Sequence, residues 1–151
     1  MGIEKVQTAG RRLSLLMRGL MVVLVAGAVM QVMWIGCLLR TFTEYGLFSA
    51  AERVVRLLLW AMICRRAAEL FQTAGQGEPF VSKNVGRLRR IALCFVGMGF
   101  LPGLAGKLAV LGAPDKPLLS IDSFLWAALI YGLSEIFRYG CALQKLDEET
   151  L

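Results

Sequence analysis

The sequence predicts an all-α fold, an integral membrane four-helix bundle with both termini in the cytoplasm. The first observation is an apolar run over residues 20–39, which carries no charge and one polar side chain, Gln31. At a rise of ~1.5 Å per residue it covers ~30 Å, the thickness of a bilayer's hydrocarbon core. The second is the hydrophobic fraction of 57%, above the ~45–50% of soluble domains. We therefore expect residues 1–151 to form a single membrane domain.

The third observation is the placement of the basic residues beside the apolar runs. With four crossings, twelve of the 17 Lys and Arg residues lie on the side of the termini and the central loop, and five lie on the other side. Basic residues accumulate on the cytoplasmic side of membrane proteins. The count therefore predicts that both ends and the loop over residues 74–81 are cytoplasmic.

The first helix is predicted over residues 14–40. Its basic start and the small residues at 26–28 resemble a cleaved signal peptide. The apolar run continues well past that site, through Leu39, so an uncleaved spanning helix is the interpretation we adopt.

The second helix is predicted over residues 49–73, because Ser49 and Glu52 have the spacing of a capping box at a helix start. Its uncharged core, Leu57–Cys64, is short, but Arg56 and Arg66 at the two ends can extend their charges to opposite interfaces. A helix lying on the membrane surface is the alternative. Whether residues 54–68 span the membrane or lie on it stays open at this point.

The third and fourth helices are predicted over residues 82–112 and 118–143. Pro102 should kink the third, because proline removes a backbone hydrogen bond inside a helix. Two pairs of small residues spaced four apart could let helices approach closely or join copies of the chain in a homo-oligomer. They are Gly99 with Gly103 and Ala128 with Gly132.

Catalysis has no support in the sequence. The chain has no histidine, its four cysteines at 37, 64, 94 and 141 have no CxxC spacing, and no nucleophile motif occurs. We therefore expect no enzyme activity, no metal and no cofactor. The net charge of +6 could suggest nucleic acid as a partner, but the clustering of the basic residues beside apolar runs argues against direct contact with it.

Polar groups within or near the apolar runs are candidates for contacts between helices, because such groups are costly in hydrocarbon. We expect Asp122 to pair with Lys107 at the outer boundary, and Glu135 to lie near Arg65, Arg66 and Arg90 at the inner one. Structural contacts are the first interpretation and an ion or proton pathway is the alternative. The candidates are Gln31, Asp122, Glu135 and Arg138.

The most distinctive segment is residues 75–90, which precede and begin the third helix. Gly77 and Pro79 predict a turn, Phe80 offers an apolar anchor, and Ser82 can cap the helix that follows. That helix start, with Val85 and Leu88 on one side, could lie on anionic lipid or dock an acidic partner. The candidate contact residues are Gly77, Glu78, Pro79, Phe80, Asn84, Arg87, Arg89 and Arg90.

Two motifs resemble a bacterial multi-pass membrane family known as domain of unknown function 2975. One is GEPFVSKNVGRLRRI at residues 77–91, and the other is LSEIFRYGCALQKLDEETL at residues 133–151. The last five residues depart from the ending common in that family. The matching positions are Gly77, Glu78, Pro79, Phe80, Asn84, Val85, Leu88, Arg89, Arg90, Glu135, Phe137, Gly140, Leu143 and Gln144.

The resemblance implies a bacterial inner-membrane protein without known enzyme activity. Genes of the family often stand beside one for a small helix-turn-helix regulator, which implies a cytoplasmic DNA-binding partner. We therefore expect a regulatory or scaffolding protein that holds such a regulator. A small transporter or channel subunit is the alternative.

Overall fold

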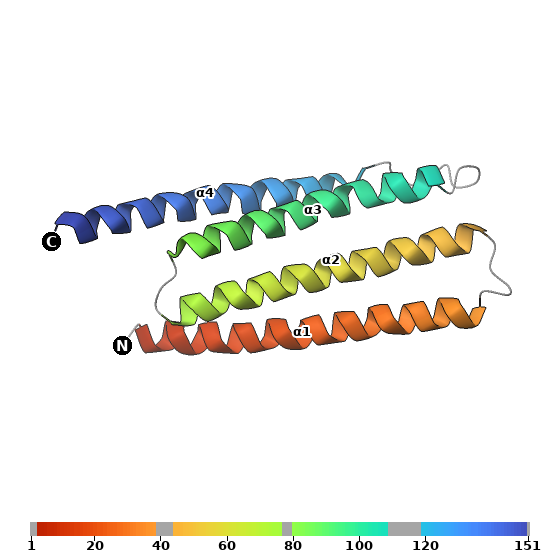
Figure 1. Cartoon of the computed structure of the whole chain (residues 1–151), viewed down its shortest axis with the longest axis horizontal. Coiled ribbons are helices and arrows are strands. Elements are labelled where there is room, and N and C mark those ends of the chain that lie inside the picture. The colour runs from red at the N-terminus through yellow and green to blue at the C-terminus, as the bar shows by residue number, and fades with distance from the viewer. Residues whose placement is uncertain (1–2, 39–43, 77–79, 109–118, 151) are drawn as a thin grey trace.

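The computed structural model describes residues 3–38, 44–76, 80–108 and 119–150. They form four helices, α1 (Ile3–Leu38), α2 (Glu44–Gly75), α3 (Ser82–Leu108) and α4 (Ile121–Thr150). The helices run alternately in opposite directions, so that both termini lie at the same end (Figure 1). The prediction of an all-α four-helix bundle is confirmed.

The helices are arranged as an open series. In the described part of the chain, α1 contacts α2, α2 contacts α3 and α3 contacts α4, whereas α1 and α4 do not meet. An apolar groove of about 810 Å³ therefore remains, lined by side chains of all four helices. Trp60 of α2 and Trp126 of α4 both line it.

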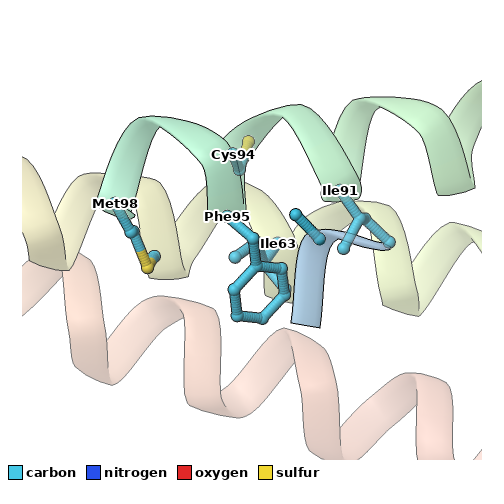
Figure 2. Packing of buried hydrophobic residues seen from close by; sticks show 6 residues of the cluster. Ile63, Ile91, Cys94, Phe95 and Met98 are labelled. Carbon is cyan, nitrogen blue, oxygen red and sulfur yellow. The ribbon is translucent and has the colours of Figure 1, made fainter. Parts of the chain in front are cut away.

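The apolar core lies between α2, α3 and α4 and is centred on α3. Figure 2 shows Phe95 of α3 beside Ile63 of α2, and the ring of Trp60 meets Phe95 edge-on with centroids 5.6 Å apart. Edge-to-face packing of aromatic rings stabilises a contact beyond the apolar area that it buries. The buried cluster is Ile63, Ile91, Cys94, Phe95, Met98 and Ala127.

The prediction that Ser49 caps α2 is wrong. The helix begins at Glu44, and the backbone carbonyl of Ser49 lies inside it, where it accepts a hydrogen bond from Arg53 Nε at 3.3 Å. Residues 44–48 contain no proline, and Gly46 costs a helix only about 1 kcal/mol. Nothing local therefore stops the helix from starting before Ser49.

The outer helices also extend beyond their expected ranges. α1 begins at Ile3 rather than near residue 14, and its Gly10 lies against Gly75 at the end of α2. α4 continues to Thr150 rather than ending near residue 143. Gln, Lys, Leu and Glu in this last segment are good helix formers, which accounts for the extension.

At the other end of the bundle, α3 and α4 are joined near Gly99. α3 continues past Pro102 to Leu108, and Ser120 N donates to Gly99 O at 3.0 Å. A Cβ atom on Gly99 would lie 2.7 Å from the ring of Phe124. The close approach expected at Gly99 is thus made by an aromatic side chain of α4.

Hydropathy singles out one helix of the described chain. Gln7–Gly36 of α1 is long and apolar enough to cross a membrane, judged by length and composition. Such a helix near the N-terminus is weak evidence for a membrane protein.

Candidate interaction surface at the charged end

The end of the bundle where both termini lie collects many of the polar side chains. We call it the charged end; it consists of the start of α1, the last turns of α2, the first turns of α3 and the last turns of α4 (Figure 1). Gly10 and Gly75 hold α1 against α2 here, since a Cβ atom on Gly10 would lie 2.8 Å from Gly75 Cα. Only glycine allows two helix backbones to approach so closely, and this crossing was not predicted from the sequence.

The carboxylate of Glu69 on α2 forms ion pairs with three arginines. It lies 3.1 Å from Arg66 Nη1, 3.3 Å from Arg87 Nε and 3.6 Å from Arg65 Nε. Arg65 and Arg66 belong to the same helix as Glu69, whereas Arg87 comes from α3. The ion pair with Arg87 therefore joins α2 to α3.

The environment of Glu69 keeps it ionised. Partial burial raises the pKa of its carboxyl group, but the hydrogen bond and charge of Arg66, with the charges of Arg87 and Arg65, together lower it more. The net pKa lies below the ordinary value. Glu69 is therefore a carboxylate at neutral pH and offsets part of the basic charge of this end.

Asn84 is fully buried beside this cluster. Its Oδ1 accepts hydrogen bonds from Arg87 Nη1 at 2.7 Å and from Thr73 Oγ1 at 3.0 Å. Arg87 also donates to the backbone carbonyl of Glu69 at 3.2 Å. Asn84 and Arg87, which were candidates for contact with a partner or lipid, thus make contacts inside the bundle that join α2 to α3.

The apolar side of the α3 start is buried too. Val85 and Leu88 are only 8% and 5% exposed. The expectation that these residues rest on a lipid surface is therefore wrong, because both side chains are buried within the chain itself.

The two motifs that carry the family resemblance meet in space. Phe80 packs against Phe137 of α4, with ring centroids 5.4 Å apart. A Cβ atom on Gly140 would lie 2.5 Å from the Phe80 ring, so that the glycine makes room for it. The apolar anchor expected at Phe80 is thus a contact within the chain.

Arg89 and Glu135 form a second contact between the motifs. Arg89 Nη2 donates to Glu135 Oε1 at 2.8 Å, and the guanidinium lies 5.9 Å from the centre of the Tyr131 ring. Arg138 Nε lies 2.8 Å from the other oxygen of Glu135, one turn along α4. Glu135 therefore pairs with Arg89 and Arg138, not with the arginines at 65, 66 and 90 that we expected.

The remaining candidates lie apart from this end. Gln31 is on α1, where its Oε1 is buried without a hydrogen-bond partner among the described residues. Asp122 is exposed at the start of α4, and the side chain of Lys107, its expected partner, lies outside the described residues. Gly77, Glu78 and Pro79 also lie outside the described residues.

Six basic side chains of the charged end are exposed and make no ion pair within the described part of the chain. They differ in this from Arg65, Arg66, Arg87 and Arg89, whose charges are offset by Glu69 or Glu135. The six are Arg11, Arg12 and Arg18 on α1, Lys83 and Arg90 on α3, and Lys145 on α4.

The last turns of α4 project beyond the starts of α1 and α3 (Figure 1). Three apolar side chains of this segment are exposed, with Tyr139 at 65%, Leu143 at 68% and Leu146 at 59%. The spacing of four and then three residues places them on one face of the helix. Because charged residues flank them, this face is a narrow apolar stripe, which we call the α4 stripe.

The described residues contain no group of three or more His, Cys, Asp or Glu side chains that could hold a metal ion. Cys64, Cys94 and Cys141 are free thiols. The side chain of Cys37 lies outside the described part.

Comparison with known proteins gives no assignment. No family model, no curated protein and no solved structure matches this chain. Its function has to be inferred from its own residues.

Proposed function

We propose that this protein is a non-enzymatic, multi-pass protein of the bacterial inner membrane that holds a cytoplasmic helix-turn-helix regulator at its charged end. The α4 stripe is the observation that carries the docking function. The distribution of apolar surface supports the membrane location, and the resemblance to the domain of unknown function 2975 family supports the class of partner.

The chain exposes more surface than a water-soluble monomer of its size. Its accessible surface is 10805 Å² for a mass of 16.6 kDa, whereas a folded soluble monomer of that mass exposes roughly 7,600 Å². Much of the excess is apolar, with Leu93 at 69%, Leu129 at 64% and Val23 at 66% exposed on three different helices. A bilayer is the solvent in which such a surface is stable.

The packing of α2 favours a spanning segment over a helix on the membrane surface. α2 lies lengthwise between α1 and α3, antiparallel to both (Figure 1). If α1 crosses the bilayer, α2 follows it through the same depth. The short uncharged core of residues 57–64 is then sheltered by its neighbours.

The α4 stripe has the properties of a docking site for a helix. α4 is 30 residues long, or ~45 Å at ~1.5 Å per residue, so that its last turns extend beyond a hydrocarbon core of ~30 Å. Neither the bilayer nor the other helices then cover Leu143. An amphipathic helix that lays its apolar face on such a stripe is a common mode of recognition.

Lys83 and Arg90 add positive charge at the same end of the bundle. They are exposed on the neighbouring first turns of α3 and are not offset by a carboxylate of the described chain. Exposed charges at the rim of an apolar patch contribute to specificity and to the rate of association. A regulator with an apolar helix and acidic groups beside it fits this arrangement.

Affinity capture of the tagged full chain from detergent-solubilised membranes tests the proposal. We expect a helix-turn-helix protein to be recovered with the unchanged chain, and at least tenfold less of it with Leu143→Ser. Gln144→Ser is the matched control, since residue 144 is exposed on the same turn but on the side of α4 away from the stripe. Lys83→Gln with Arg90→Gln should give a smaller loss that grows at low salt.

Two results would contradict the docking function. One is the recovery of no DNA-binding protein with the unchanged chain. The other is equal recovery with Leu143→Ser and Gln144→Ser. Arg87→Gln and Arg89→Gln are unsuitable variants for this test, because these arginines make ion pairs within the bundle.

A further inference from the structure

A polar pocket lies between α1 and α2 at the charged end, away from the α4 stripe. Its volume is about 340 Å³, within the ~300–1,000 Å³ range of small-molecule sites. Five of its seven lining residues are polar or charged, and the other two are Leu15 and Gly75. The five are Arg11, Ser14, Arg18, Gln72 and Gln76.

The sequence of α1 brings these groups onto one face. Arg11, Ser14 and Arg18 are spaced by three and four residues, so they follow each other along one side of the helix. The crossing of Gly10 over Gly75 sets α1 directly against the end of α2. Gln72 and Gln76 of α2 thereby lie opposite the arginines of α1.

No carboxylate of the described residues offsets the positive charge in this pocket. Arg18 Nη2 donates to Gln72 Oε1 at 2.6 Å, and the amide is a neutral partner. Arg11 makes no ion pair in the described part of the chain. The arginines around Glu69 differ from these two, because a carboxylate already occupies their donors.

We propose that this pocket binds the phosphate group of an anionic phospholipid of the cytoplasmic leaflet. Guanidinium groups donate two parallel hydrogen bonds to phosphate oxygens, which makes paired arginines suited to this group. Basic pockets between membrane helices on the cytoplasmic side are known sites for anionic headgroups. The inference rests on the proposed membrane orientation but not on the docking of a regulator.

The surroundings of the pocket fit a lipid better than free phosphate. Leu15 lines the pocket, and Leu16 and Leu20 follow it on α1, exposed by 68% and 47%. The uncharged run of α1 begins one residue after Arg18. A phosphate held by Arg11 and Arg18 would therefore lie at headgroup depth, with acyl chains along the apolar surface of α1.

Native mass spectrometry of the purified full chain in detergent, titrated with phosphatidylglycerol, tests this assignment. We expect Arg11→Gln with Arg18→Gln to weaken lipid binding about thirty-fold, taking the usual contribution of each basic residue near an anionic membrane surface. The double variant Lys83→Gln with Arg90→Gln removes the same amount of charge from the charged end. It should change the affinity for phosphatidylglycerol less than threefold. Thermal unfolding in detergent establishes that both double variants are folded.

Three results would overturn the assignment. Equal weakening of lipid binding by the two double variants would mean that binding depends on the net charge of this end alone. Equal binding of phosphatidylethanolamine would remove the selectivity for anionic headgroups. Displacement of the lipid by millimolar inorganic phosphate would identify a site for free phosphate. None of these results bears on Leu143, so the docking proposal is tested separately.

Discussion

α1 and α3 are both long helices with apolar runs, yet they differ in how much of their surface they bury. Over residues 7–36 of α1, two residues are buried, Ser14 and Ala28, whereas nine are buried over residues 82–103 of α3. α1 is the more apolar of the two, as its mean hydropathy indicates. In a water-soluble bundle the more apolar helix would be the more buried one.

The difference shows that apolarity has two separate roles in this chain. Most apolar side chains of α3 serve packing, because α2 and α4 cover them, although Leu93 and Phe100 are exposed. Those of α1 point outward in most directions and suit an apolar surrounding. Mutations in the two helices should therefore differ in their effect on stability.

The largest effect is expected in the core of α3. Phe95→Ala removes a ring that is 8% exposed and contacts Trp60, and it should lower the free energy of unfolding by about 3 kcal/mol. Val23→Ala on α1, at a side chain 66% exposed, should change it by less than about 0.5 kcal/mol. Unfolding in detergent measures both changes in the free energy of unfolding. Equal losses of stability would contradict the different roles of α1 and α3.

The next effect concerns the polar interior of the charged end. Asn84→Ala removes the acceptor that Arg87 and Thr73 share and should cost about 2 kcal/mol, since a buried hydrogen bond to a charged donor is lost. Lys83→Ala, at the exposed residue next to it, should be nearly neutral. A loss of stability as large for Lys83→Ala as for Asn84→Ala would argue against the buried network.

A third prediction addresses how α1 is attached. Gly10→Ala places a methyl group against the backbone of α2 and should cost about 1.5 kcal/mol by overpacking. Gly19→Ala meets nothing within 4 Å and should stabilise the helix by roughly 0.5–1 kcal/mol. Opposite signs of the two changes in thermal stability are the expected result, and equal signs would place the helix crossing elsewhere.

The smallest effect is expected for the pair of Arg89 and Glu135. Their side chains are 45% and 26% exposed, and exposed ion pairs contribute about 0.2–1 kcal/mol. A double-mutant cycle with Arg89→Gln and Glu135→Gln should give a coupling free energy of about 0.5 kcal/mol that declines with salt. A coupling free energy of zero at low salt would show that the two motifs are joined by Phe80 alone.

The sequence pattern predicted the features that depend on neighbouring residues. The number of helices, the start of α3 at Ser82 and the role of Phe80 as an apolar anchor follow from local patterns. The partners of these residues depend on how distant segments align. Phe80 therefore gives no sign in sequence that it packs on Phe137, and the Gly10–Gly75 crossing joins glycines that look like ordinary members of two helices.

The ion pairs around Glu69 could also be predicted only in part from the sequence. The clustering of basic residues near the α2–α3 turn was evident, but Glu69 was not singled out, because its significance comes from Arg87 on another helix. The predicted start of α2 was wrong for the opposite reason, since the local capping pattern at Ser49 lies inside a helix that begins at Glu44. Local motifs indicate what a segment can do, and tertiary contacts decide which of these possibilities is realised.

Thiol labelling in spheroplasts tests the central claim, a bundle that spans the inner membrane with its charged end in the cytoplasm. The native cysteines are replaced by serine, and single cysteines are introduced by Leu119→Cys at the far end and Lys83→Cys at the charged end. We predict that a membrane-impermeant maleimide labels the first variant in intact spheroplasts and the second only after permeabilisation. Labelling of both before permeabilisation, the reverse order, or recovery of the chain in the soluble fraction would contradict the account.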